Sequence, residues 1–367
     1  MSDVIISGYH GYANSGDEAL LYAILNTLRK QKPDIGVTVL SKVPDETASE
    51  YNVNSVYRYN FFKIKKAMQH SKLLLFGGGS LLQDVTSSKS ILYYLTIINM
   101  AHKCGLKIML YANGIGPITK KINRHLCSKI LNKVDIITLR DDKSDEELKK
   151  LGVTTPRVII TADPAFTIDT GVSFSGEYYT KRAGVPVGTK LCVVSIRDYK
   201  KFAPDFISQM AKLCDYSIEK HNIYPLFVPM QYPLDMEISR KVMAKMKNES
   251  YIINRELSVA EMFSVMSEAE LVIGMRLHSL IYATTLAIPA MALVYDPKVS
   301  AFMGSLNQPD CISAENFRLD DAKQCLDGLV YQNEKRRKIL CETNKELRKK
   351  AEDNTGYAIE LLEKSDD

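Results

Sequence analysis

The stretch "ELVIGMRLHSLIYATTLAIPAMALVYDPK", residues 270–298, predicts a strand, a helix and a second strand in close succession. Its outer runs, "ELVIG" and "AMALVY", are short and apolar, which is typical of buried strands. Two strands connected by a helix usually lie parallel in one sheet. This stretch therefore predicts a parallel α/β fold.

Short apolar runs alternate with stretches of helical period through most of the chain. Such alternation predicts βαβ units, with helices on both faces of a parallel sheet. The pattern lapses over residues 167–189, which are rich in Gly, Ser and Thr, and then resumes. The strand candidates before the lapse are "DVIIS", "VTVLS", "KLLLF", "KIMLYA", "DIITL" and "RVIITA", and those after it are "KLCVVSI", "YPLFVPM", "YIIN", "ELVIG" and "AMALVY".

We therefore predict an α/β protein with two Rossmann-like, doubly wound domains. The expected parts are an N-terminal domain (1–170), a linker (171–189), a C-terminal domain (190–345) and a C-terminal helix (346–367). A chain of 367 residues is too long for one ordinary core, which agrees with this division.

The composition limits the class of protein and its partners. The formal charge of +5 is mild, so it favours anionic small molecules or an anionic membrane surface over nucleic acid. Seven widely spaced cysteines without a C-x-x-C motif do not form a disulfide framework or a zinc site. Neither a leader pattern nor a membrane-spanning run is evident. We expect a cytoplasmic protein without metal or other cofactor.

In open parallel sheets, ligands bind outside the carboxyl ends of the strands. In the first segment that follows a strand, Asn14 and Asp17 are short polar side chains that suit sugar hydroxyls. A Gly-rich turn kept only for packing is the alternative. The "GGGS" turn at 77–80 is able to form an anion- or hydroxyl-binding nest, and packing explains it equally well. The other segments that directly follow strand candidates in this domain are 113–117, 140–147 and 163–166.

Helix starts help to position Arg140. Capping boxes are predicted at Ser15 with Glu18, Ser144 with Glu147, and Ser258 with Glu261, and Gly152 is a candidate C-terminal cap. The second box puts Arg140 at the end of a strand, in the turn before a helix. Its side chain is then a candidate anion ligand, and an ion pair with Asp141 or Asp142 is the alternative.

Three cationic or titratable residues follow neighbouring strand candidates in the second domain. Arg276 and His278 follow "ELVIG", and Lys298 follows "AMALVY". Guanidinium groups bind carboxylate or phosphate, and a helix N-terminus adds amide donors for an anion. Histidine transfers protons near neutral pH. The set predicts a site for a small, multiply anionic ligand with a proton transfer.

The motifs resemble a known family. "GYHGYANSGDEALL", "GGGSLLQD", "GIGP", "LRDDKS", "DPAF" and "RLHS" occur in this order in polysaccharide pyruvyl transferases, and the chain is most similar to the bacterial cell-wall type called CsaB. The resemblance implies a glycosyltransferase-B-like fold, in which the two domains face a cleft and the last helix crosses back to the first domain.

The resemblance also implies a reaction. Members of the family transfer pyruvate from phosphoenolpyruvate, a co-substrate, to a sugar as a cyclic ketal and release phosphate. The implied acceptor is a β-linked N-acetylmannosamine, ketalated across O4 and O6, in a lipid-linked precursor of secondary cell-wall polymer. The product anchors surface-layer proteins to the wall.

The resemblance assigns roles to particular residues. The implied donor ligands are Arg140, Arg276, His278, Ser279 and Lys298, among which His278, Arg140 and Lys298 are the catalytic candidates. The implied acceptor residues are Asn14, Asp17, Gly78, Gly79 and Ser80.

A lipid-linked acceptor requires access to the membrane. "YNFFKIKKAM", residues 59–68, combines aromatic and basic side chains and suits anionic lipid, although an ordinary solvated helix face is the equal alternative. A homo-oligomer is compatible with the sequence. The rival functions are a nucleotide-sugar glycosyltransferase on the same fold and a non-catalytic, lectin-like module.

Overall fold

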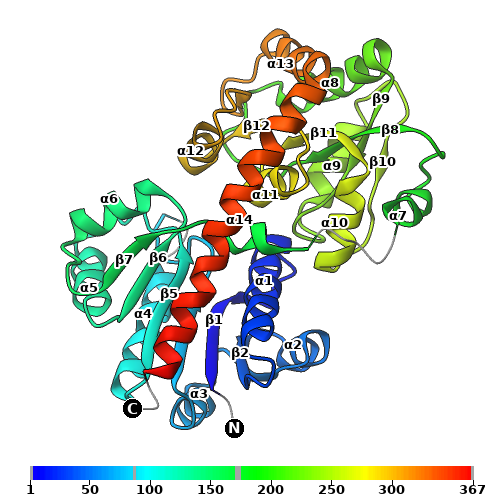
Figure 1. Ribbon diagram of the computed structural model, residues 1–367. Coiled ribbons are helices and arrows are strands. Elements are labelled where there is room, and N and C mark those ends of the chain that lie inside the picture. The colour runs from blue at the N-terminus through cyan, green and yellow to red at the C-terminus, as the bar shows by residue number, and fades with distance from the viewer. Residues whose placement is uncertain (1–2, 86–87, 170–174, 365–367) are drawn as a thin grey trace. The chain divides into compact units, whose positions relative to one another are not determined.

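The computed structural model describes residues 3–85, 88–169 and 175–364. The chain divides into two compact units (Figure 1). Unit 1 comprises Met1–Ile168 and Leu347–Asp367, and unit 2 comprises Asp169–Glu346.

Unit 1 contains a seven-stranded sheet in the order β3-β2-β1-β4-β5-β6-β7, and every neighbouring pair is parallel. Its strands are β1 (Val4–His10), β2 (Val37–Ser41), β3 (Asn54–Tyr57), β4 (Leu73–Gly77), β5 (Lys107–Asn113), β6 (Ile136–Leu139) and β7 (Arg157–Ile160). Its helices are α1 (Ser15–Gln31), α2 (Pro44–Tyr51), α3 (Phe61–Met68), α4 (Ser88–Lys103), α5 (Lys121–Leu131), α6 (Asp142–Leu151) and the 3₁₀ helix η1 (Pro164–Thr167).

Both faces of this sheet are buried. Ile5 belongs to one apolar cluster, together with residues of α4, α5 and α6, whereas its neighbour Ile6 belongs to a second cluster with residues of α1. Successive side chains of a strand point to opposite faces, so a continuous apolar run is required when helices cover both. This is why the central strands show no alternation of polar and apolar residues.

Unit 2 contains a six-stranded parallel sheet in the order β10-β9-β8-β11-β12-β13. Its strands are β8 (Lys190–Ser195), β9 (Ile223–Phe227), β10 (Tyr251–Ile252), β11 (Ala269–Gly274), β12 (Ala290–Val294) and β13 (Cys311–Ser313). Its helices are α7 (Gly176–Arg182), α8 (Phe206–His221), α9 (Met236–Met243), α10 (Val259–Ser267), α11 (Leu277–Thr285), α12 (Pro297–Ser305) and α13 (Leu319–Tyr331).

The expected linker, residues 171–189, includes helix α7. A Cβ added to Gly176, the first residue of α7, would lie 2.0 Å from the Ser264 carbonyl oxygen of α10. This closeness means that α7 packs directly on α10 as part of unit 2. Residues 171–174 of the expected linker lie outside the described residues.

The last helix, α14 (Asn333–Glu363), contributes to both units. Near its start, Arg337 donates to the carbonyl of Ala269 in unit 2. From Leu347 onward it belongs to unit 1, where Thr355 shares a 2.7 Å hydrogen bond with Tyr111 of β5. Among the described residues, no helix combines the length and apolar content that crossing a membrane requires.

Candidate functional site

Arg140 connects three other segments that follow strands in unit 1. It comes directly after β6, and its Nη1 donates to the carboxylate of Asp163 at 2.8 Å. Its Nη2 donates to the Ser80 hydroxyl at 2.9 Å. A Cβ added to Gly114 would lie 3.3 Å from its Nε, so a small residue at that position accommodates the guanidinium. The "GGGS", "GIGP" and "DPAF" motifs therefore meet at one arginine.

Asp163 is the principal charge partner of Arg140. The Arg140 and Asp163 side chains are only 7% and 3% exposed. Of the two carboxylates named as alternatives, Asp141 approaches Nε at 3.9 Å. The bond to Ser80 also joins a predicted donor ligand to a predicted acceptor residue within unit 1.

Asn14 and Asp17, two of the predicted acceptor residues, lie at the start of α1 and have different contacts. The Asn14 side chain accepts a hydrogen bond from the Gly16 N–H at 3.2 Å and caps α1. The preceding Ala13 has a φ of +52°, a conformation that costs energy for a residue with a Cβ. Asp17 lies beside the glycine turn, because a Cβ added to Gly79 would be 3.3 Å from its Oδ1.

Gly78 and Gly79 form a tight turn with positive φ values of 60° and 72°. A Cβ on Gly78 would lie 2.6 Å from Leu20 of α1, and the Gly78 N–H donates to the Tyr111 carbonyl at 2.9 Å. Because this N–H is already used within the sheet, the contacts of Gly78 favour the packing alternative over an anion-binding nest.

Arg276 is held rigidly in unit 2. It occupies the N-cap position of α11, directly after β11. Its Nε and Nη2 donate to the two oxygens of Asp235, both at 2.7 Å, and Nη2 also donates to Gln231 at 3.0 Å. Asp235 is 1% exposed. Within the described part of the chain, Nη1 of Arg276 makes no hydrogen bond, so this edge of the guanidinium remains available to a ligand.

His278 and Ser279 lie in the first turn of α11, as the sequence predicts. The His278 side chain is partly exposed, and its ring centroid is 6.2 Å from that of Tyr282. Ser279 is fully buried, and its hydroxyl donates to the Arg276 carbonyl at 2.6 Å. Ser279 thus stabilises the helix start, and its hydroxyl is occupied.

The Lys298 side chain is more exposed, at 40%, than those of Arg140 and Arg276, at 7% and 11%. It lies in α12 after β12, the parallel neighbour of β11, and its Nζ is 3.5 Å from Asp296. Arg197 follows β8, the other neighbour of β11, and contacts the Tyr295 ring at 5.4 Å. Cationic side chains therefore follow three consecutive strands of the sheet.

The sequence interpretation missed Asp163, Asp235 and Arg197 as parts of these sites. Each lies in a segment that follows a strand, and Asp163 lies in the "DPAF" motif. A position shortly after a strand is thus a sequence signal for all three residues. The pairing of Asp235 with Arg276 carries no such local signal, because the two residues are 41 positions apart.

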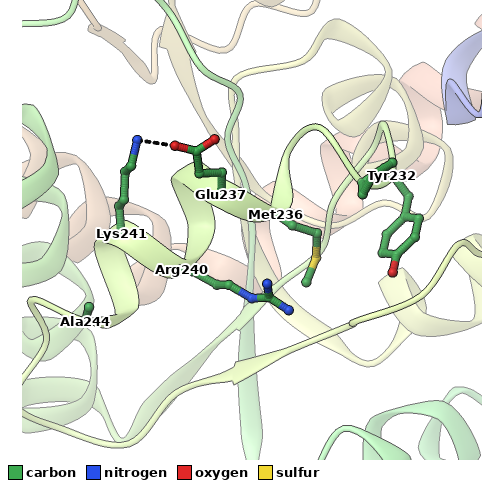
Figure 2. A pocket seen from close by; sticks show the side chains of 7 residues that line it. Tyr232, Met236, Glu237, Arg240, Lys241 and Ala244 are labelled. Carbon is green, nitrogen blue, oxygen red and sulfur yellow. Dashed lines mark ion pairs between the residues drawn. The ribbon is translucent and has the colours of Figure 1, made fainter.

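A separate depression of about 460 Å³ lies along α9 (Figure 2). All its lining residues belong to one segment, 232–244, and Glu237 pairs with Lys241 along the helix. It contains none of the predicted site residues. The carboxyl ends of the strands remain the better candidates, because side chains from several segments meet there.

Comparison with known proteins identifies relatives of this chain. The curated protein AmsJ of Erwinia amylovora, described as an amylovoran biosynthesis protein, is 21% identical over 383 residues, which cover 89% of this chain and 90% of AmsJ. HepE of Anabaena, solved with UDP and glucose, gives a TM-score of 0.65 at 8% identity and covers 99% of this chain and 100% of its own. The UDP-GlcNAc 2-epimerase of Neisseria meningitidis, solved with UDP-GlcNAc, gives 0.65 at 11%, with coverages of 98% and 100%.

At these identities the solved structures establish the fold alone. They confirm the predicted class, two Rossmann-like α/β domains of the glycosyltransferase-B-like kind. The family model described as polysaccharide pyruvyl transferase matches residues 14–297, which include Arg140, Arg276 and His278. Because this match spans most of the sequence, the chain belongs to the polysaccharide pyruvyl transferase family.

Proposed function

We propose that this enzyme transfers pyruvate from phosphoenolpyruvate to two hydroxyls of a sugar, forming a cyclic ketal and releasing phosphate. The observation that carries the proposal is the set of cationic side chains after β8, β11 and β12, with His278 beside them. Phosphoenolpyruvate carries a carboxylate and a phosphate, and such a ligand requires several convergent cations.

Arg276 is the proposed primary donor ligand. Asp235 and Gln231 fix its guanidinium plane, and the Nη1 edge is left to bind one anionic group. The N-terminus of α11 supplies further positive potential in the same place. Lys298 is proposed to bind the second anionic group. Arg140 belongs to unit 1, and its roles as donor ligand and catalytic residue remain predictions from the family resemblance.

His278 is proposed to move protons in this reaction. The methylene carbon of the donor gains a proton, which makes C2 electrophilic. One sugar hydroxyl attacks C2 and loses its proton. Phosphate then leaves C2, the second hydroxyl bonds to C2 and closes the ketal, and the proton of this hydroxyl passes to the phosphate. A partly exposed histidine beside the anion ligands suits one or more of these transfers.

The proposed acceptor is a β-linked N-acetylmannosamine in a lipid-linked precursor of secondary cell-wall polymer, as in the CsaB type. Asp17 and the Gly79–Ser80 turn, which lie together in unit 1, are the proposed acceptor contacts. The membrane that carries such a precursor is proposed to contact α3, whose Phe61, Phe62 and three lysines are all exposed.

The alternative function is sugar transfer from a nucleotide sugar. Both solved structures named above favour it, because one contains UDP and glucose and the other contains UDP-GlcNAc. It requires a pocket for base and ribose. The family match and the histidine beside the cations favour pyruvyl transfer instead.

The test is phosphate release from phosphoenolpyruvate, with and without a synthetic β-N-acetylmannosaminyl aryl glycoside or lipid. We expect release only with the acceptor, together with a product heavier by one pyruvate ketal. His278→Ala should still bind phosphoenolpyruvate and lose about 10²–10⁴-fold in turnover, the usual contribution of a general acid or base. Consumption of a nucleotide sugar without phosphoenolpyruvate turnover contradicts the proposal.

A further inference from the structure

Unit 1 contains a buried arginine without a carboxylate partner. Arg58, which directly follows β3, is only 3% exposed. Its Nη1 donates to the Gly8 carbonyl at 3.0 Å, and its Nε has no hydrogen-bond partner among the described residues. No ion pair to Arg58 exists within the described part of the chain. A buried charge without such a partner is costly, and it requires another source of stabilisation.

Aromatic rings supply that stabilisation. The guanidinium carbon lies 4.5–5.9 Å from the centroids of five tyrosine rings. We call Arg58 with these rings the Arg58 cluster, and its tyrosines are Tyr9, Tyr12, Tyr59, Tyr93 and Tyr94. Cation–π attraction at this range stabilises a desolvated guanidinium. It also fixes the positions of the rings.

The rings form an ordered array. Tyr9 and Tyr12 stack at 4.0 Å with planes 5° apart, and the Tyr12 and Tyr59 hydroxyls lie 3.2 Å from each other. Tyr59 packs edge-on against Tyr93 at 5.4 Å. Burial raises the pKa of Tyr93 to about 12, so its hydroxyl stays neutral and donates to the Arg58 carbonyl at 2.9 Å.

Part of this array reaches the surface. Tyr59 is 46% exposed, and its neighbour Tyr57 is 38% exposed. Tyr57 and Tyr59 are neighbours in space, and contiguous exposed aromatic side chains form a candidate binding surface. The array therefore has one side fixed by Arg58 and another side open to a ligand.

The array lies beside the proposed acceptor residues. Tyr12 lies in the loop after β1, and Asn14 and Asp17 follow it at the N-cap and in the first turn of α1. Burial, and to a smaller extent the charge of Asp17, raises the pKa of Tyr94. A pyranose ring has an apolar C–H face that packs on an aromatic ring, and hydroxyls that bind phenol and carboxylate oxygens. Aromatic rings fixed beside a carboxylate match both properties.

We propose that Tyr59 and Tyr12, positioned by Arg58, bind a pyranose ring of the glycan acceptor. This inference rests on the proposed function, since it identifies the surface that receives the acceptor. Tyr59 and Tyr12 are the contact residues, and Arg58 is a positioning residue that holds their rings in place.

The experiment compares Tyr59→Ala, Tyr59→Phe and Arg58→Lys with the wild type in full-length protein. Tyr178→Ala is the matched control, because Tyr178 is also exposed and also contacts an arginine, Arg182, but lies in unit 2. Tyr59 is exposed, so its replacement should leave folding intact. The Arg58 substitution keeps the charge and removes the planar fork that orders the rings. Thermal unfolding of every variant verifies the fold.

Steady-state phosphate release is measured against the aryl glycoside and against phosphoenolpyruvate. We expect Tyr59→Ala and Arg58→Lys to raise KM for the glycoside about fivefold to tenfold, the scale of one lost aromatic contact, with KM for phosphoenolpyruvate unchanged. Tyr59→Phe should retain most of the affinity because it retains the ring. An unchanged glycoside KM in Tyr59→Ala overturns the inference.

Equilibrium binding separates this inference from the proposed function. Saturation-transfer NMR is recorded with aryl glycosides of N-acetylmannosamine, glucose and galactose, and with UDP, all without phosphoenolpyruvate. If the wild type releases no phosphate but binds a glycoside, and Tyr59→Ala loses that binding, the proposed function fails and the inference holds. If the wild type binds none of the glycosides, or if Tyr59→Ala loses UDP binding alone, the inference is overturned.

Discussion

At the scale of single residues, the two arginines among the proposed anion ligands are also parts of buried ion pairs. Arg276 and Arg140 are held by the nearly buried carboxylates of Asp235 and Asp163. A guanidinium fixed in this way loses little conformational entropy when it binds a ligand. Replacing either arginine with alanine therefore removes both a proposed anion ligand and the partner of a buried carboxylate.

Arg276→Ala should therefore affect both donor binding and stability. We expect phosphoenolpyruvate affinity to fall by about 2–5 kcal/mol, the usual loss for a buried charge contact. The free energy of unfolding should fall by about 3–5 kcal/mol, because Asp235 is left buried and unpaired. Calorimetric titration and urea unfolding measure the two effects.

The double variant Arg276→Ala/Asp235→Ala separates these effects. It should recover much of the lost stability, because the uncompensated charge is gone, but it should not recover donor affinity. Recovery of phosphoenolpyruvate binding in the double variant would refute the assignment of Arg276 as a donor ligand.

His10, at the end of β1, should make stability depend on pH. Its ring is 1% exposed and covers Gly8, and burial together with the charge of Arg58 lowers its pKa to about 3. The unfolded chain binds this proton near pH 6.5, so the stability falls as pH drops from about 6.5 toward 3. The loss between pH 7 and pH 4 is on the order of 3 kcal/mol.

Urea unfolding of the wild type and of His10→Gln at both pH values measures this contribution. The other titrating groups are common to both proteins, so the difference between their pH slopes isolates His10. Equal slopes in the two proteins would show that His10 does not titrate in this way.

At the scale of elements, the central strands were predictable and several boundaries were not. The interpretation found every central strand and missed β3 and β13, which lie at sheet edges. These two edge strands are short and only partly buried, and their sequences lack the apolar run by which the edge strands β7 and β10 were recognised.

The predicted capping boxes were also only partly correct. The box of Ser258 and Glu261 is confirmed with both of its hydrogen bonds. The other two are wrong, because α1 is capped by Asn14 and α6 by Asp141. Asn and Asp are at least as good N-caps as Ser, so adjacent candidates compete and the pattern alone does not choose between them.

Helix α3 is the element that we expect to contact the membrane. It buries Ile64 and Met68 and exposes Phe62, at 81%, together with Lys63, Lys65 and Lys66. No acidic residue occurs between Glu50 and Asp84. Exposed aromatic and basic side chains without compensating acids suit an anionic bilayer surface.

Cosedimentation with vesicles of phosphatidylglycerol and phosphatidylcholine tests this contact. Replacing the three lysines of α3 with glutamine should weaken binding by about 1 kcal/mol per lysine, and added salt should weaken it further. Replacement of Lys120, Lys121 and Ile122, an exposed basic and apolar group at α5, is the matched control. Equal losses in both variants would indicate a nonspecific charge effect.

At the scale of the whole molecule, the fold followed from the sequence because each βαβ unit carries its own local signal. Arg276, His278 and Lys298 could be placed after strands for the same reason. The carboxylates that hold the arginines, and the tyrosines around Arg58, come from separate loops, a strand and helix α4. Their contacts depend on strand order and side-chain direction, which periodicity does not contain.

Helix α14 makes the stability of the two units depend on different parts of one element. Leu361 and Leu362 belong to the apolar cluster of unit 1, whereas Leu340 is buried in the part of the helix that belongs to unit 2. Removing a buried leucine side chain costs about 2–5 kcal/mol in the core to which it belongs. The two ends of α14 should therefore destabilise different units.

Hydrogen exchange with peptide-level mass spectrometry tests this expectation. Leu361→Ala should speed exchange in β1 and β5 of unit 1, and Leu340→Ala, the matched control, should speed it in unit 2, because locally stabilised regions open independently. If either substitution accelerated exchange equally in both sheets, the units would unfold as one cooperative body. The continuous helix would then transmit the loss from one core to the other.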